Sequence, residues 1–217
     1  MAITYNNLYL DIRQQFLRAG LPDPTLESRE LVCCASGKSR EELSRDGRLY
    51  VPDTVEQQVR RLAQRHLDGE PVAYLIGEWE FYGLPLDISE SVLIPRPDTE
   101  VLVDRALACI KTLDEPRVLD LCAGSGCIGL AVASRVKDAR VTLADISKEA
   151  LAVAKKNIAQ NKLGGRMSIF QVDARKKAPN FLGKFDMIVS NPPYITGEEM
   201  KQLPRSVDAF EPHLALY

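Results

Sequence analysis

Histidine is scarce in this sequence and no two cysteines have the C-x-x-C spacing, which leaves little from which to build a metal site. There are two histidines, His66 and His213, and the five cysteines include no C-x-x-C pair. Structural zinc sites draw their four ligands from cysteine and histidine, commonly at such close spacing. We therefore expect no metal, and the cysteine usage predicts a reduced, cytoplasmic protein.

Long apolar runs and an excess of charge of one sign are also missing. No apolar stretch reaches the ~20 residues of a membrane-spanning helix, so we expect neither a membrane segment nor a signal sequence. The 28 Lys and Arg residues are offset by 30 Asp and Glu, and the first 80 residues carry 10 basic and 13 acidic side chains. Because nucleic-acid affinity depends on basic side chains, this balance disfavours direct nucleic-acid binding. The remaining composition, 45% hydrophobic and 27% charged over 217 residues, is that of a globular protein.

Apolar residues in the first third of the chain recur at helical spacing. Leu8, Ile12 and Phe16 would share one face of a helix, and Gly20 and Gly69 mark breaks between helices. The pattern predicts a small all-helical domain over residues 1–78. Short β-like pieces around Gly83 then predict a β-hairpin linker over residues 79–96.

Strands and helices alternate in the rest of the chain, residues 97–217. A helix is expected to follow Asp98 through about Ile110, and further helices over 127–136 and 148–161. The expected strands are short and apolar: Arg117 to Leu121, Val141 to Ala144, Met167 to Val172 and Phe185 to Ser190. This alternation predicts an α/β domain with a parallel, Rossmann-like sheet.

The first of these strands runs into a glycine-rich turn. Gly124, Gly126 and Gly129 have the G-x-G-x-x-G spacing, which lets a ligand approach the backbone closely. Asp145 ends the next strand, 21 positions after Gly124, where a carboxylate can accept hydrogen bonds from both hydroxyls of a ribose. Together they predict a site for a nucleoside-bearing cofactor. NAD, with its pyrophosphate at the helix amino terminus, is one alternative. A purely structural turn, with Asp145 capping the next helix, is another.

Asn191-Pro192-Pro193-Tyr194 directly follows the last strand. The prolines fix the backbone and present the Asn191 side chain and the Pro192 carbonyl at the carboxyl end of the sheet, where ligands bind in open α/β folds. These two acceptors would hold both N–H groups of a primary amide or amine and aim its nitrogen at an electrophilic methyl group, with Tyr194 packed on its plane. No neighbouring side chain is an obvious general base, so we expect the proton to leave after methyl transfer. A rigid turn without a chemical role is the alternative.

Four segments together resemble the HemK/PrmC family, the peptide chain release factor N5-glutamine methyltransferases. They are residues 70–77, 94–100, 120–129 and 191–195. The resemblance covers the whole chain, and the segment Ile-Pro-Arg-Pro-Asp-Thr-Glu at 94–100 is the most specific, since adenine methyltransferases share Asn-Pro-Pro-Tyr. The resemblance implies a class I methyltransferase fold, S-adenosyl-L-methionine as cofactor and methylation of the glutamine in the Gly-Gly-Gln motif of release factors.

The resemblance also implies roles for individual residues. The methionine-side loop of the cofactor site would consist of Cys122, Ala123, Gly124, Ser125 and Gly126. Asp145 would hold the ribose, and Asp173 and Ala174 would border the adenine. The glutamine amide would be held by Asn191, Pro192, Pro193 and Tyr194, with Asn191 also beside the cofactor. Residues 96–100 would line the approach to the cofactor. The helical domain would contact the release factor, and we expect a monomer with no membrane partner.

Two features depart from the family pattern. The loop usually reads Asp-x-Gly-x-Gly-x-Gly, whereas Cys122 stands at the first glycine position. We expect cysteine to fit there on the assumption of an ordinary backbone angle. Family members also continue past Leu216, and a complete domain has seven strands where we expect four. We therefore expect an incomplete sheet with the strand over 185–190 as an exposed apolar edge, and a chain in which cofactor binding is better supported than turnover.

Two other functions stay open at this point. An adenine-N6 methyltransferase acting on DNA or RNA would use the same Asn-Pro-Pro-Tyr chemistry, but it predicts a basic recognition surface that the charge balance does not supply. An inactive binding module would keep the helical domain and dock on a ribosomal or release factor partner without turnover.

Overall fold

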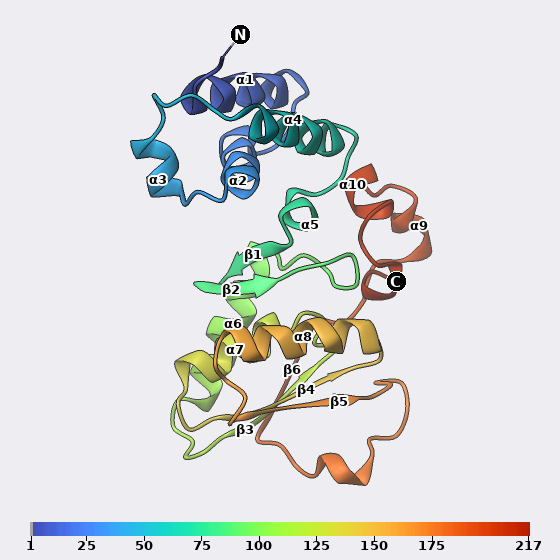
Figure 1. Ribbon diagram of the computed structural model, residues 1–217. Helices are drawn as coiled ribbons and strands as arrows, with labels where there is room; N and C mark the ends of the chain where they lie inside the picture. The colour runs from blue at the N-terminus through green and yellow to red at the C-terminus, as the bar shows by residue number, and fades with distance from the viewer. Residues whose placement is uncertain (1) are drawn as a thin grey trace. The chain divides into compact units, whose positions relative to one another are not determined.

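The computed structural model describes residues 2–217, and the contacts within the chain divide it into two units (Figure 1). The first unit ends at Ile76 and the second spans Gly77–Tyr217. The hairpin region therefore groups with the second unit by its contacts. The domain boundaries at 78 and 96 stay a prediction.

The first unit is mainly helical. Its helices are α1 Tyr5–Arg18, α2 Pro24–Ser36, α3 Arg40–Arg45, α4 Asp53–Leu67 and α5 Val72–Ile76. The stripe of Leu8, Ile12 and Phe16 on α1 is fully buried, and α1 packs on α2 and α4. A reciprocal capping box between Ser39 and Glu42 starts α3, since each side chain accepts a hydrogen bond from the other residue's backbone N–H.

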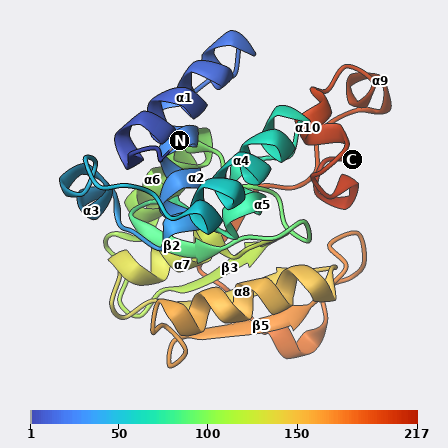
Figure 2. The ribbon, with the colours of Figure 1, turned by 45° about the horizontal axis from the view of Figure 1, so that its top comes forward.

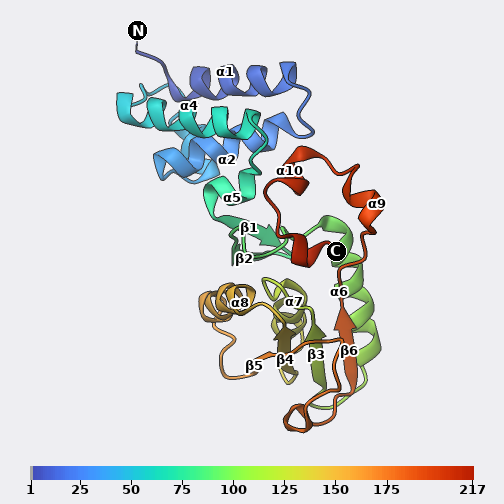
Figure 3. The same ribbon diagram turned by 90° about the vertical axis from the view of Figure 1, so that its right-hand side faces the viewer.

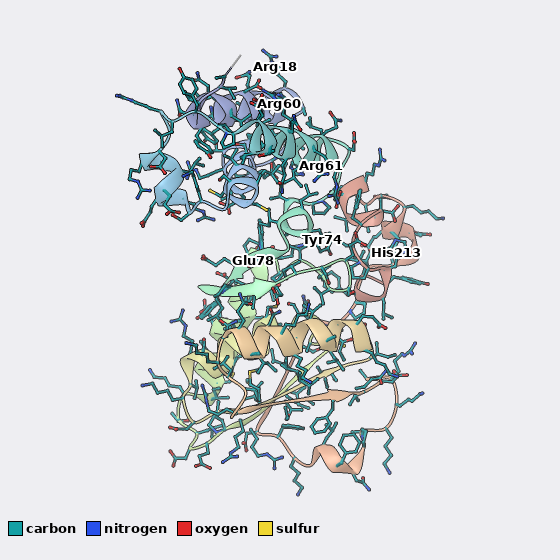
Figure 4. The ribbon with its side chains drawn as sticks, viewed as in Figure 1. Arg18, Arg60, Arg61, Tyr74, Glu78 and His213 are labelled. Atoms are coloured by element: carbon teal, nitrogen blue, oxygen red, sulfur yellow. The ribbon has the colours of Figure 1, made fainter. Side chains whose placement is uncertain are left out.

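The arginines of α4 lie on its exposed side. Arg60 donates to Asp11 of α1 at 2.8 Å and to Glu56 one turn earlier at 2.9 Å (Figure 4). Arg61 is exposed beside it. Pairs of this kind at the surface contribute only about 0–1 kcal/mol each, so the packing of the buried stripe dominates the stability of this unit.

The second unit begins with an antiparallel hairpin of β1 Glu78–Phe81 and β2 Leu84–Asp87. After α6 Pro97–Ile110, the chain alternates through β3 Arg117–Leu121, α7 Cys127–Arg135, β4 Arg140–Asp145, α8 Lys148–Gln160 and β5 Met167–Gln171. The short 3-10 helix η1 Asn180–Leu182 precedes β6 Met187–Ser190. Each strand predicted from the sequence is present, with ends that differ by at most two residues.

The four strands form one parallel sheet in the order β5-β4-β3-β6. Helices α6, α7 and α8 lie side by side on one face, where α8 runs along β5 and β4 and α6 packs on β6 (Figures 2 and 3). On the other face, Leu182 of η1 packs with Leu119, Ala144 and Val172. The predicted Rossmann-like α/β fold is confirmed.

Strand β6 is an edge of this sheet, in agreement with the expectation. Its side chains alternate: Val189 is buried, whereas Ile188 is 61% exposed. After β6 come three short elements, α9 Gly197–Met200, α10 Arg205–Asp208 and η2 His213–Ala215. None of the helices in residues 2–217 is long and apolar enough to span a membrane.

Two polar side chains sit inside the core beside the glycine loop. Asn157 of α8, fully buried, exchanges hydrogen bonds with the backbone of Asp87 and donates to the carbonyl of Ser125, which ties the hairpin to the loop. Asp120 of β3 is also fully buried; its Oδ2 accepts from the N–H of Gly129 at 2.8 Å, and its Oδ1 has no hydrogen-bond partner among residues 2–217. Burial raises the pKa of Asp120 to about 7, because loss of water disfavours the charged form.

Gly129 is expected to tolerate no side chain. A Cβ there would collide with Leu143 and lie 3.0 Å from Asp120 Oδ2 and 3.1 Å from Val141 Cγ1. Gly129→Ala should lower the free energy of unfolding by about 1–3 kcal/mol, measured by urea denaturation. Gly165→Ala is the matched control, since a Cβ there meets nothing within 4 Å. Helix α7 packs on β3 and β4, and equal stability of the two variants would contradict a close fit of the helix there.

Asp120 should make the stability of the second unit depend on pH. Its folded-state pKa, about 7, lies above the ordinary value of 3.8, so the folded chain holds a proton that the unfolded chain has lost. The free energy of unfolding should therefore fall as the pH rises from about 4 to about 7, by an amount on the order of 4 kcal/mol. Asp120→Asn, which cannot titrate, should flatten this decline in denaturation curves taken across that range. A decline that persists unchanged would assign it to other groups.

Candidate active site

The register of the parallel sheet brings the ends of three strands together at its carboxyl edge. Leu121 of β3 pairs with Ala144 of β4 on one side and with Ser190 of β6 on the other. The next residue of each strand therefore lies at the same edge of the sheet. These residues are Cys122 after Leu121, Asp145 after Ala144 and Asn191 after Ser190. Polar side chains and loops from three strands thus converge at one edge of the sheet.

A cavity of about 630 Å³ lies at this end of the sheet, entirely within the second unit. Its volume falls in the range of small-molecule sites, about 300–1,000 Å³. Ten of the twelve site residues predicted from the sequence line it: Cys122, Ala123, Gly124, Ser125, Asp145, Asp173, Ala174, Asn191, Pro192 and Pro193. The other two, Gly126 and Tyr194, do not.

Gly126 and Tyr194, the two predicted site residues that do not line the cavity, have different structural surroundings. Gly126 caps α7 with a left-handed backbone, φ +79°, and a Cβ there would come within 2.7 Å of Leu130 and Leu143. Its lack of a side chain serves the packing of the turn. Tyr194 is 76% exposed, so its ring does not pack into the cavity in this structure.

Asp145 organises the glycine loop through backbone hydrogen bonds. Its Oδ2 accepts from the N–H of Gly124 at 2.8 Å and its Oδ1 from the N–H of Ser147 at 2.9 Å. The cap of α8 is Ser147, whose hydroxyl accepts from Ala150 N–H, so the alternative that made Asp145 the cap is wrong. A carboxylate offers about four lone-pair sites, which leaves acceptor capacity facing the cavity.

Cys122 corrects one expectation from the sequence. Its backbone is left-handed, with φ +60°, and is not the ordinary conformation that was assumed. A residue with a Cβ pays about 1–2 kcal/mol there, which explains why glycine is usual at this position. Burial raises the pKa of the Cys122 thiol above its ordinary value of 9.0, so the thiol stays protonated at neutral pH and is a poor nucleophile.

Asp173 is held by a neighbour close in sequence. Its carboxylate accepts from the side chain of Arg175 at 3.0 and 3.2 Å and from the Arg175 N–H at 3.1 Å. These hydrogen bonds lower the pKa of Asp173 to about 2. The carboxylate is thus ionised and fixed beside Ala174 at the edge of the cavity.

The side-chain amide of Asn191 is a polar group of the site that is free to bind a ligand. Among residues 2–217 its side-chain amide has no hydrogen-bond partner, although the residue is half-buried. Its neighbour Ser190 is anchored, since the hydroxyl donates to the carbonyl of Leu121 at 2.6 Å. An anchored strand end followed by a free amide is suited to binding a ligand with both a donor and an acceptor.

Analysis of the sequence missed one side of this cavity. Ser91 and Leu93 line it from the segment before α6, and Pro212, Leu214 and Tyr217 from the end of the chain, whereas Arg96 and Thr99 fall in the range 96–100 expected to line the approach. An ion pair between Arg96 and the buried Glu211 links the two segments. No local motif marks Glu211, and only its partner Arg96 was named from the sequence. No cluster of three or more possible metal ligands occurs within the described residues 2–217.

Comparisons with known proteins agree with this architecture. The model of the PrmC N-terminal domain matches residues 7–77, and that of the methyltransferase small domain matches residues 99–206. Among solved structures, the catalytic domain of hMettl16, in complex with a 3'UTR hairpin, aligns with a TM-score of 0.50 at 19% identity, over 62% of this chain and 51% of that one. At this identity the likeness supports the fold alone.

Three curated relatives carry the name release factor glutamine methyltransferase. The protein from Neisseria gonorrhoeae is 42% identical over 89% of this chain and 69% of its own length. That from Chlorobaculum tepidum is 36% identical over 93% and 71%, and that from Fusobacterium nucleatum 36% over 91% and 55%. This chain thus spans little more than half of the Fusobacterium relative. By these similarities over most of its length, the chain belongs to the release factor glutamine methyltransferase family.

Proposed function

We propose that the cavity binds S-adenosyl-L-methionine and that the protein methylates the N5 amide nitrogen of the glutamine in the Gly-Gly-Gln motif of peptide chain release factors. The observation that supports this most directly is the free amide of Asn191 at the cavity that Asp145 and the glycine loop also line. The names of the relatives support release factors as the acceptor.

The residues of the cavity fit this cofactor. The carboxylate of Asp145 is available to the ribose hydroxyls, and the backbone at Gly124 carries no Cβ that would limit close approach. Asp173 and Ala174 border the region expected for the adenine. When bound, S-adenosyl-L-methionine supplies a methyl group activated by its positive sulfur.

The acceptor end of the site works by positioning. An amide nitrogen is a weak nucleophile, because its lone pair is delocalised into the carbonyl. The Asn191 side-chain oxygen and the Pro192 carbonyl would accept its two N–H groups and aim the nitrogen along the line of transfer. The motif Asn191-Pro192-Pro193-Tyr194 contains no general base, so the nitrogen would release its proton after the new N–C bond has formed. Tyr194, exposed here, would pack on the amide only after the acceptor has bound.

Adenine-N6 methylation of nucleic acid is not favoured. The whole chain has 28 basic and 30 acidic residues, of which 10 basic and 11 acidic lie at or before Ile76. The second unit therefore carries 18 basic and 19 acidic residues. A nucleic-acid enzyme would need a basic face that this balance does not supply.

Asp145→Ala should weaken cofactor binding. S-adenosylhomocysteine, titrated into the chain in a calorimeter, should bind the wild type, and the variant should show a dissociation constant larger by about tenfold or more because the ribose loses a charged acceptor. Asp138→Ala is the control, since Asp138 is exposed and outside the cavity. Equal affinities for all three proteins would place the cofactor elsewhere.

Asn191→Ala should slow transfer strongly while leaving cofactor binding nearly unchanged. Mass spectrometry of a release factor incubated with the wild type and S-adenosyl-L-methionine should show a gain of one methyl group on the Gly-Gly-Gln glutamine. The variant should be slower by about 10²-fold or more, with an S-adenosylhomocysteine affinity within about threefold of the wild type, since a positioning loss leaves the ribose contacts unchanged.

Two controls make this test specific. A release factor with Gly-Gly-Ala should gain nothing, and Asn180→Ala, an exposed asparagine outside the cavity, should behave as the wild type. A folded wild type that binds the cofactor but leaves the release factor unmodified would argue for a different acceptor or for a binding function only.

A further inference from the structure

Residues 196–217 form a segment with almost no core of its own. Only Glu211 and Leu216 are buried in it, and the short elements α9, α10 and η2 bury no side chain. Figure 4 shows His213 on this segment, where its ring nitrogen lies 2.8 Å from the carbonyl of Asp208, a contact internal to the segment. The segment is therefore held in place mainly by what Glu211 and Leu216 contact.

These two attachments reach both sides of the cavity. Glu211 Oε2 accepts from the N–H of Ile94 at 3.3 Å, and its other oxygen forms a charge-assisted hydrogen bond with the guanidinium of Arg96. The carbonyl of Leu216 accepts from the N–H of Ile195 at 2.9 Å, directly after Tyr194. The segment thus begins and ends beside the Asn-Pro-Pro-Tyr turn and is fastened, between these points, to the loop before α6.

The segment contributes lining to the acceptor side of the cavity. Pro212, Leu214 and Tyr217 line it together with Pro192 and Pro193. Leu214 and Tyr217 are 55% and 72% exposed, so they offer apolar surface to an incoming protein. The cofactor side is held independently, because Asp145 and the glycine loop hydrogen-bond to each other at the end of the sheet.

We propose that the Arg96–Glu211 ion pair is a positioning element that holds residues 196–217 beside the Asn-Pro-Pro-Tyr turn and thereby sets the affinity for the protein acceptor. Neither residue takes part in the chemical step. The proposal rests on the proposed function for its acceptor, and its structural half, that the ion pair holds the segment, can be tested without any acceptor.

Glu211→Gln tests both halves. The amide oxygen can still accept from Ile94 N–H, but the charge that attracts Arg96 is gone. Hydrogen exchange of the backbone amides over 195–217 should become faster by about tenfold or more, with the sheet unchanged. The KM for the release factor should rise by about tenfold while kcat stays within about twofold and the S-adenosylhomocysteine affinity within about threefold, the pattern of lost acceptor binding.

Glu198→Gln is the matched control, since it makes the same chemical change at an exposed carboxylate of the same segment. Arg96→Lys, which keeps a cation but not the planar guanidinium, is the second variant and carries the test if Glu211→Gln fails to fold. Its effect on exchange and KM should lie between those of the wild type and Glu211→Gln.

The outcomes separate the two proposals. If hydrogen exchange and KM of Glu211→Gln match those of Glu198→Gln, the positioning role is overturned. A loss of S-adenosylhomocysteine affinity as large as the rise in KM would also overturn it, because the ion pair would then support the whole cavity. If the wild type binds S-adenosylhomocysteine but methylates no release factor, the proposed function fails for that acceptor. Exchange over 195–217 then decides by itself whether the ion pair holds the segment.

Discussion

The hydrogen-bond register of one parallel sheet determines where the chemistry of this protein can take place. Because Leu121 pairs with both Ala144 and Ser190, three strand ends stop at one level and their next residues face a common space. In an antiparallel arrangement, alternate strands would carry these loops to opposite ends. The glycine loop, Asp145 and Asn191 are separated in sequence, and the register of the sheet makes them neighbours.

Much of this architecture could be predicted from the sequence, because its signals are local. Short apolar strands alternate with helices, and the residues after each strand end carry the distinctive groups, so ten of the twelve predicted site residues share one cavity. Glu211 could not be found in this way. Its partner Arg96 lies 115 positions earlier in the sequence. An ion pair between two charged residues so far apart produces no periodic pattern in the sequence.

The backbone of Cys122 was predicted wrongly for a related reason. Its φ of +60° is imposed by the tight exit from β3, where the Ala123 N–H must reach the carbonyl of Ala144 at 3.1 Å and Gly124 N–H the carboxylate of Asp145. Those partners lie on β4, so the residue type at 122 gives no warning of the angle. The loop tolerates a left-handed cysteine because its other hydrogen bonds over-determine the turn.

The two buried carboxyl groups of the second unit show how its two sides differ. Asp120, with one backbone donor and an unpartnered oxygen, has its pKa raised to about 7 and belongs to the rigid packing of α7 on the sheet. Glu211 has a guanidinium and a backbone N–H as partners, and Arg96 is 41% exposed, so water can replace it. In the proposed function, the cofactor side is therefore fixed by the core, whereas the acceptor side depends on polar contacts near the surface. If the acceptor is a protein loop, as proposed, this division places the adjustable part of the site where that loop would enter.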